Sequence, residues 1–305
     1  MNFNDNRNLN DQIKKLKEEK NAVILAHNYQ VLEIQEIADF TGDSLELSRM
    51  ATETEADIIV FCGVDFMAET ASILNPDKKV LIPSKKAICP MAAQLTPDMI
   101  IEAKKSKHIP FITYVNSSAE CKAEADICCT SSNAAQIVKS LDHEEAFMGP
   151  DVNLAWFAEK QSGKKVTPVP ADGYCYVHRA FGEEDIKRAR ETYPQAEIMV
   201  HPECNPEVQL LADYIGSTSQ MVKRAETSEA EQIIVGTEIG LIDRMKRDLP
   251  EKEFIPLKEV VCEEMKMNNL NKILDALKTE EFEVKVPQET AERAIKSVKR
   301  MLDVI

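Results

Sequence analysis

Apolar runs of strand length alternate with amphipathic stretches along the chain. Residues 23–26 and 58–63 are almost entirely apolar, and the second run is typical of a strand buried on both faces of a parallel sheet. Residues 8–20 and 45–54 instead place apolar side chains at helical spacing. Helices that alternate with buried strands predict an α/β fold in which right-handed crossovers join parallel strands.

The same order of elements occurs three times. A third strand is predicted at residues 79–83, and the series of helices and strands then restarts near residue 98 and again near residue 184. Sets of positions share a spacing of 86 or 87 residues: His27, Tyr114 and His201; Ser44, Ser131 and Thr218; Asp11, Asp98 and Asp185; Gly63, Gly149 and Gly236. A period of this length indicates repeated domains rather than a solenoid.

The repeat predicts three small αβα units around a pseudo-threefold axis, each with a short parallel sheet. We expect the units at residues 1–92, 93–179 and 180–265. Residues 266–305 follow the repeat, with helices predicted at 265–279 and 288–303, and we expect this segment to pack back on the first unit. Functional side chains in such sheets gather beyond the carboxyl ends of the strands, so the site is expected at the axis.

Three of the eight cysteines, Cys89, Cys175 and Cys262, occur in this register, each after the third predicted strand of its unit. Three thiolates can hold a [4Fe–4S] cluster and leave one iron without a protein ligand, and this is the arrangement we predict. Two alternatives are three buried structural cysteines and a three-cysteine zinc site, which would lack a matching fourth ligand.

The other five cysteines, Cys62, Cys121, Cys128, Cys129 and Cys204, fall outside the register. Cys62 lies in a predicted strand, Cys121 and Cys204 in predicted loops, and the adjacent pair just before a predicted helix. We expect these side chains to be small buried apolar groups. The chain contains no C-x-x-C motif, so a zinc knuckle or a thioredoxin-type site is not expected.

Charge and apolar run length narrow the classes of function. The net charge of −15 argues against nucleic acid and anionic membranes as partners. Its longest apolar runs are too short to span a bilayer, and the first residues lack the apolar core of a signal peptide. We therefore expect a cytoplasmic protein whose cysteines are thiols or metal ligands.

Polar side chains at two kinds of position predict the chemistry of the site. Ser44, Ser131 and Thr218 stand where helices are predicted to begin, so they either cap these helices or mark a place where backbone N–H groups bind anions. The predicted first strands end in pairs of acid–base or hydrogen-bonding groups: His27 and Tyr29, Tyr114 and Asn116, His201 and Glu203. Such a set can perform general acid–base catalysis beside a metal.

Several motifs resemble those of the quinolinate synthase family, from about residue 20 to the C-terminus. They are Ala26-His27-Asn28-Tyr29-Gln30, Gly42-Asp43-Ser44, residues 114–120 (YVNSSAE), residues 130–134 (TSSNA), Gly149-Pro150-Asp151, His201-Pro202-Glu203-Cys204 and Val235-Gly236-Thr237-Glu238. The resemblance implies three αβα domains in a triangle around an oxygen-sensitive [4Fe–4S] cluster on Cys89, Cys175 and Cys262. Cys121 departs from the family pattern.

The family condenses iminoaspartate with dihydroxyacetone phosphate to quinolinate in NAD biosynthesis, with loss of phosphate and two waters. By resemblance, the catalytic residues are Glu203, His201, Tyr29 and His27. The substrate-binding residues by resemblance are Ser44, Tyr114, Asn116, Ser131, Thr218 and Thr237. The iron without a protein ligand would bind a substrate oxygen, and an aspartate oxidase or dehydrogenase would supply iminoaspartate.

Two other functions use similar features. A reductive dehydratase of isoprenoid type also places a three-cysteine cluster in a threefold αβα protein, but it needs an electron donor, and its diphosphate substrate favours basic residues. An iron–sulfur redox sensor or electron carrier usually has four cysteine ligands and little use for the polar groups at the strand ends. Formation of a pyridine dicarboxylate without reductant would distinguish the synthase from both.

Overall fold

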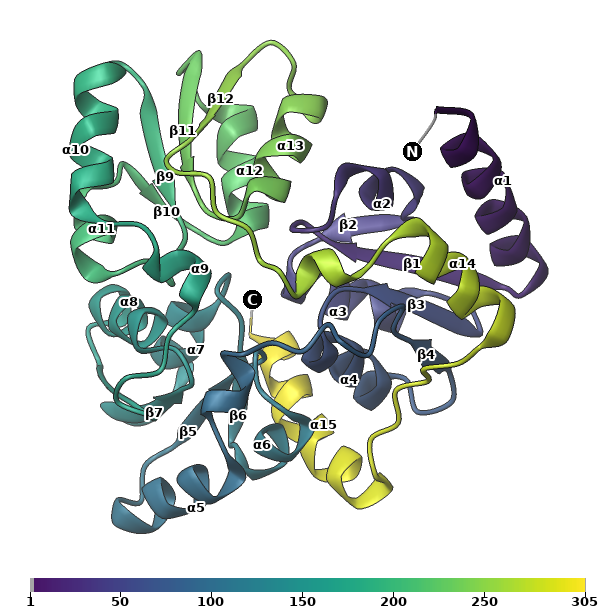
Figure 1. Cartoon of the computed structure of the whole chain (residues 1–305). Helices are drawn as coiled ribbons and strands as arrows, with labels where there is room; N and C mark the ends of the chain where they lie inside the picture. Colours follow the sequence, from purple (N-terminus) through teal and green to yellow (C-terminus); the bar gives the residue numbers. More distant parts are fainter. Residues whose placement is uncertain (1–2, 305) are drawn as a thin grey trace.

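The computed structural model describes residues 3–304, over which three α/β units form a triangle (Figure 1). Each unit has a four-stranded parallel sheet, and the strand order is the same in all three. The predicted fold class is therefore confirmed. No helix of residues 3–304 is both long and apolar enough to cross a membrane.

The first unit shows how the sequence produces the sheet. Its elements are α1 (Phe3–Glu19), β1 (Ala22–His27), α2 (Leu32–Ile37), β2 (Phe40–Gly42), α3 (Ser44–Glu53), β3 (Ile58–Cys62), α4 (Asp65–Leu74) and β4 (Lys79–Leu81). The order across the sheet is β2-β1-β3-β4. Alternate residues of β1 enter different apolar clusters, Val23 and Leu25 one and Ile24 and Ala26 the other. Both faces of the sheet are thus buried, which explains the unbroken apolar run.

The second and third units repeat this order. The second contains α5 (Pro97–Ser106), β5 (Phe111–Tyr114), α6 (Ala119–Glu124), β6 (Ile127–Cys129), α7 (Ala134–Ser140), β7 (Glu145–Gly149), α8 (Val152–Ser162) and β8 (Lys165–Pro168). The third contains α10 (Glu183–Thr192), β9 (Glu197–Val200), α11 (Pro206–Leu211), β10 (Tyr214–Ile215), α12 (Thr218–Thr227), β11 (Gln232–Gly236), α13 (Ile239–Asp248) and β12 (Glu253–Pro256). The short helix η1 (Ala92–Gln94) lies between the first and second units, and α9 (Tyr176–Arg179) lies between the second and third.

One strand in each unit was not predicted. The edge strands β2, β6 and β10 are two or three residues long, too short to produce a periodic pattern in the sequence. Each predicted range, 1–92, 93–179 and 180–265, encloses one sheet, and the boundaries themselves stay a prediction.

The units contact one another through equivalent helices. α4 of the first unit packs against α6 of the second, α8 of the second against α11 of the third, and α13 of the third against α2 of the first. The helix that follows the β3-type strand therefore meets the helix that follows the β1-type strand at every interface. This repetition gives the molecule its pseudo-threefold arrangement.

The C-terminal segment breaks the symmetry. It contains η2 (Met265–Met267), α14 (Leu270–Thr279) and α15 (Gln288–Asp303). α14 packs on α1 of the first unit, whereas α15 lies mainly on α6 and β6 of the second unit and also touches α4 (Figure 1). The difference has an apolar cause, because Ala294, Val298 and Met301 are buried and join clusters shared by the two units. α15 therefore bridges the first and second units.

Candidate active site

A buried cavity of about 60 Å³ lies where the three units meet. Its lining includes these predicted site residues: His27, Tyr29, Ser44, Cys89, Tyr114, Asn116, Ser131, Cys175, His201, Glu203, Thr218 and Cys262. Thr237 is not in the lining but binds the hydroxyl of Tyr29. The structure thus brings together side chains that are up to 235 residues apart in sequence.

The topology explains why these side chains meet. β1, β5 and β9 hold the same place in their sheets, and His27, Tyr114 and His201 stand at or just after their carboxyl ends. Because parallel strands present their carboxyl ends at one edge of a sheet, each unit directs its polar residues toward the axis.

Glu203 is the acidic group of the cavity that contacts two histidines. Its Oε2 lies 2.6 Å from Nδ1 of His178 and 3.7 Å from Nδ1 of His201, and the two imidazole rings stack with centroids 4.3 Å apart. Burial alone would raise the pKa of Glu203, but His201, His178 and the hydroxyl of Tyr114 outweigh it and hold the pKa at about 2. Glu203 is therefore a carboxylate at neutral pH.

His27 and His201 share a local geometry that fixes their tautomers. Nδ1 of His27 accepts the backbone N–H of Tyr29 at 3.2 Å, and Nδ1 of His201 accepts the N–H of Glu203 at 3.3 Å. Burial lowers the pKa of both histidines to about 3. Both rings are thus neutral near pH 7 and carry their proton on Nε2, which is then available as a donor.

His178 also lines the cavity, although it is not among the predicted site residues. Its Nε2 lies 2.9 Å from Oγ1 of Thr237 and 3.2 Å from Oη of Tyr29, and these two oxygens are 2.6 Å apart. The search for repeated positions could not find it, since its register partners are Ala92 and Met265. The available signal was its position three residues after Cys175, which places both side chains on one face of a helical turn.

Both tyrosines of the cavity are neutral phenols. Burial and the charge of Glu203 raise the pKa of Tyr29 and of Tyr114 well above the ordinary value. Tyr29 can therefore donate its proton to an acceptor or accept a hydrogen bond. With His178 and Thr237 it forms a continuous polar path to Glu203.

A repeated carboxylate holds each register cysteine. The backbone N–H of Cys89 donates to Asp65 at 3.0 Å, that of Cys175 to Asp151 at 3.1 Å, and that of Cys262 to Glu238 at 3.3 Å. Each acceptor lies 24 residues before its cysteine and at the start of the helix that follows the β3-type strand. The sequence contains a signal for this arrangement that was not used above, a Gly-x-acid motif that begins at Gly63, Gly149 and Gly236. The three cysteine loops are thus held in the same way.

The donor set fits a cluster better than a single ion. Over the described residues, one group of three metal-ligating side chains has its atoms within 4.8 Å of one another, and it contains Cys175 but neither Cys89 nor Cys262. The three sulfurs are therefore too widely spaced to surround one zinc ion without movement. Burial raises the pKa of each thiol, to about 12 for Cys262, so metal binding must displace their protons.

The helices near Ser44, Ser131 and Thr218 start at positions that give these three hydroxyls different places relative to the N-caps. Ser44 and Thr218 are the first residues of α3 and α12, and the N-caps are Asp43 and Ser217. α7 begins only at Ala134, so Ser131 lies in the turn before it. Asp43 and Ser217 cap α3 and α12 through their side chains, whereas Asn133, the N-cap of α7, makes no side-chain capping bond. The hydroxyls of Ser44, Ser131 and Thr218 line the cavity.

Asp43 occupies the place where the three units converge behind these hydroxyls. Its Oδ1 accepts the N–H groups of Leu45 and Glu46 at 3.0 Å, and its Oδ2 accepts the hydroxyls of Ser132 and, at 2.8 Å, Ser217. An internal carboxylate thus already satisfies part of the helix N-termini. An external anion would instead meet the hydroxyls that line the cavity, whose described lining contains no Lys or Arg.

Asn116 provides an independent sign of a ligand. Its Oδ1 is buried and has no hydrogen-bond partner among the described residues, although Asn116 lines the cavity. Buried polar atoms are almost always paired in folded proteins. A bound molecule with a donor at this point would satisfy it.

The five cysteines outside the register are all buried thiols, as predicted. Two details differ from the sequence analysis: Cys121 lies in α6 rather than in a loop, with its sulfur 3.3 Å from the carbonyl of Leu95, and Cys128 and Cys129 belong to β6. Cys121 therefore packs away from the cavity, whose described lining holds only the three register cysteines.

Comparison with known proteins gives matches over almost the whole chain. The family described as Quinolinate synthetase A protein matches residues 11–303. A quinolinate synthase of Methanothermobacter thermautotrophicus is 52% identical over 298 residues, which cover 97% of this chain and 98% of that protein. The quinolinate synthase of Thermococcus kodakarensis is 54% identical over 96% of this chain and 97% of that protein. The quinolinate synthase of Thermotoga maritima is 49% identical over 97% of this chain and 99% of that protein.

Proposed function

The chain belongs to the quinolinate synthetase A family and is a quinolinate synthase, and we propose that it condenses iminoaspartate with dihydroxyacetone phosphate, releasing phosphate and two waters. The observation that carries this proposal is one buried cavity in which three cysteines from three units face an asymmetric set of acid–base groups. The family assignment decides against the isoprenoid-type dehydratase and the electron carrier.

We propose that Cys89, Cys175 and Cys262 hold a [4Fe–4S] cluster. When bound, it supplies a Lewis-acidic iron without a protein ligand. The equivalent hydrogen bonds from the backbone N–H groups of the three cysteines to Asp65, Asp151 and Glu238 support this assignment, because they hold the three loops in place without using the sulfurs.

Substrate anions are bound mainly by neutral donors in this proposal. The hydroxyls of Ser44, Ser131 and Thr218 line the cavity, and Nδ2 of Asn28 donates to Oγ1 of Thr218 at 2.8 Å. This bond leaves the hydroxyl proton of Thr218 free to point at a ligand. The amide of Asn116 and the Tyr114 phenol complete the substrate side of the cavity.

Glu203 acts as the principal base in this mechanism. C–C bond formation, isomerisation and loss of phosphate and water each require proton transfers, and an ionised carboxylate can accept the first proton. Nδ1 of His178, 2.6 Å away, can share that proton, and the path continues through Nε2 to Thr237 and Tyr29. The Nε2–H groups of His27 and His201 assist as donors to substrate oxygens.

We also propose that the chain works in the cytoplasm beside an aspartate oxidase or dehydrogenase that forms iminoaspartate. An imine hydrolyses in water, so a short path between its source and this cavity would preserve it.

The test supplies both precursors to the anaerobically reconstituted chain without any reductant. A pyridine dicarboxylate, identified by mass spectrometry, is the expected product. The Cys175→Ser variant is expected to contain little iron and to form none. If the wild-type chain holds a full cluster and forms no such product from intact precursors, the proposal is wrong.

A further inference from the structure

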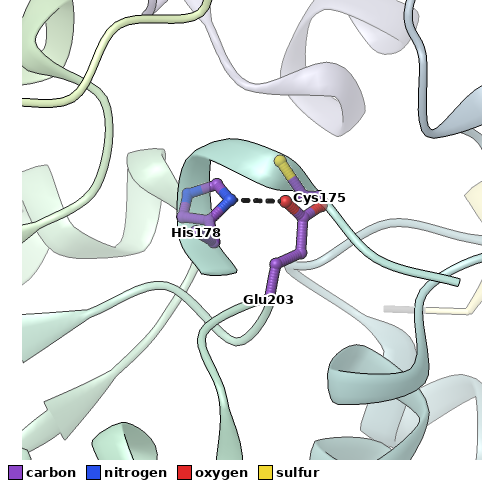
Figure 2. Close-up of side chains that lie close together, drawn as sticks. All are labelled: Cys175, His178 and Glu203. Atoms are coloured by element: carbon purple, nitrogen blue, oxygen red, sulfur yellow. Dashed lines mark ion pairs between the residues drawn. The ribbon is translucent and has the colours of Figure 1, made fainter. Parts of the chain in front are cut away.

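Cys175, His178 and Glu203 each place one possible metal-ligand atom close to the other two, and Nδ1 of His178 contacts Oε2 of Glu203 at 2.6 Å in a pair that a bound ion would separate (Figure 2). Cys175 is the N-cap of α9 and His178 lies one helical turn later, while Glu203 reaches them from the loop after β9. One ligand atom from each residue lies within 4.8 Å of the other two. The side chains converge on one point from two elements.

The chemistry of the three donors matches Zn²⁺ and similar divalent ions. A sulfur, an imidazole nitrogen and a carboxylate oxygen are the ligands that zinc prefers, and three protein ligands plus one open position are typical of non-structural zinc sites. One thiolate and one carboxylate would neutralise the two charges of the ion. Since His178 and Glu203 are 1% and 3% exposed, this neutrality matters for binding in a buried place.

The surroundings of His178 also resemble those of a metal-ligating histidine. If Nδ1 binds the ion, Nε2 needs a second partner that fixes the ring. That partner exists, because Nε2 lies 2.9 Å from the hydroxyl of Thr237. The backbone N–H of Cys175 is in turn held by Asp151, so two of the three ligands are positioned before any ion arrives.

We propose that Cys175, His178 and Glu203 bind one divalent ion of the Zn²⁺ class in the cluster-free chain, and that this ion competes with cluster assembly. Cys175 cannot be a ligand of both the ion and the cluster at the same time. The ion would also bind Glu203, the proposed base. The inference rests on the proposed function only for the role of Cys175 as a cluster ligand. Whether this site holds the divalent ion would then decide whether a newly made chain can assemble its cluster.

The experiment titrates the full-length, cluster-free chain with Co²⁺ under anaerobic conditions. One equivalent is expected to bind, with a sulfur-to-cobalt charge-transfer band in the near ultraviolet and intense visible bands of four-coordinate cobalt. Cys175→Ser should abolish the charge-transfer band, and His178→Ala and Glu203→Gln should each weaken binding by about tenfold or more. Cys89→Ser and Cys262→Ser are the matched controls and should bind as the wild type does.

A second measurement, cysteine alkylation, uses the wild-type chain and so does not require that any variant folds. One equivalent of Zn²⁺ should protect Cys175 from alkylation while Cys89 and Cys262 react as before, and it should lower the iron incorporated on later addition of iron and sulfide. Equal dependence on all three cysteines would place the ion among the three thiolates and overturn the inference, as would absence of Co²⁺ binding. If the cluster-free chain binds no Co²⁺ but forms quinolinate after reconstitution, this inference alone is refuted. If the chain binds Co²⁺ but never assembles a cluster on reconstitution, the result counts against the proposed cofactor instead.

Discussion

Glu203 lies in the loop after β9, where its Oε2 is close to Nδ1 of two stacked histidine rings, and it is 3% exposed. Replacement by Gln keeps its size and removes its charge, so Glu203→Gln should lower the rate of quinolinate formation by about 10²- to 10⁴-fold, the usual contribution of a general base. Discontinuous chromatography of the product measures this rate. Glu207→Gln, an exposed glutamate four residues away, is the control and should be unaffected. A near wild-type rate for Glu203→Gln would remove this residue from the mechanism.

The two neutral histidines make stability depend on pH. His27 and His201 have a pKa of about 3 in the folded chain because burial disfavours the charged ring, against about 6.5 when unfolded. Between these values the unfolded chain binds protons that the folded chain does not, so stability is complete above pH 6.5 and is lost as the pH falls. Each histidine contributes about 1.4 kcal/mol per pH unit to this loss. Thermal unfolding of the cluster-free chain from pH 7 to pH 4 measures the slope.

Glu203 also makes folding stability fall as the pH is lowered, but over a more acidic range. Its folded pKa of about 2 lies below the unfolded value, so its contribution is present above about pH 4.3 and is lost toward pH 2. The control for the histidines is His143→Asn, an exposed position, which should keep the wild-type slope, whereas His201→Asn should flatten it between pH 6.5 and pH 4. An unchanged slope in His201→Asn would mean that this ring is not held neutral.

At the residue scale, functional side chains that recur in the 86–87-residue register can be predicted from the sequence, whereas those that occur in one unit alone cannot. His27, Tyr114 and His201 share a register and were found by it. His178 and Asp43 have no chemically similar partners in the other units: Ala92 and Met265 correspond to the first, Thr130 and Ser217 to the second. Their roles arise from contacts between units, such as the bonds from Ser132 and Ser217 to Asp43. A single sequence carries no local sign of such contacts.

At the scale of elements, helix starts and cysteine loops are coupled. Asp151 caps α8 through the N–H of Leu154 at 2.7 Å with one oxygen and holds the N–H of Cys175 with the other. Asn has one acceptor oxygen and can retain only one of these bonds. Asp151→Asn should therefore lower the free energy of unfolding by about 1 kcal/mol and speed the loss of iron from the reconstituted chain.

Two measurements test this coupling. Denaturant unfolding of the cluster-free chain gives the free energy, and iron content with the decay of visible absorbance in air gives the rate of cluster loss. Asp172→Asn, an exposed aspartate in the same connection, is the control. A variant that unfolds more easily but keeps its iron as long as the wild type does would show that Asp151 serves only as a helix cap.

Long elements were predicted because their patterns span enough residues to be periodic. β1, β3, α3 and α15 fall within a few residues of their predicted places. The short strands β2, β6 and β10 were not predicted. Their two or three residues form strands only because β1, β5 and β9 lie beside them. Their existence is a consequence of tertiary structure and not of local preference.

At the scale of the whole molecule, the repeat predicted three units and a common centre but not how firmly each interface is held. α15 packs on the first two units with buried apolar residues, among them Ala294 and Val298. The third unit meets the first through polar bonds as well, such as that from Asn28 to Thr218 and that from Gln35 to the carbonyl of Gly240. Apolar contacts need to stay together to remain buried, while polar ones can exchange with water.

This difference predicts which part moves when ligand binds. The cavity of about 60 Å³ is far smaller than the roughly 300–1,000 Å³ of typical ligand sites, so two substrates can enter only if units separate. We expect the third unit to move against a body formed by the first two and α15. Hydrogen exchange measured by mass spectrometry should therefore slow at residues 28–30 and 217–221 when quinolinate binds, and stay unchanged in α6 and α15. Protection that appears instead between α6 and α15 would mean that the interface under α15 is the one that opens.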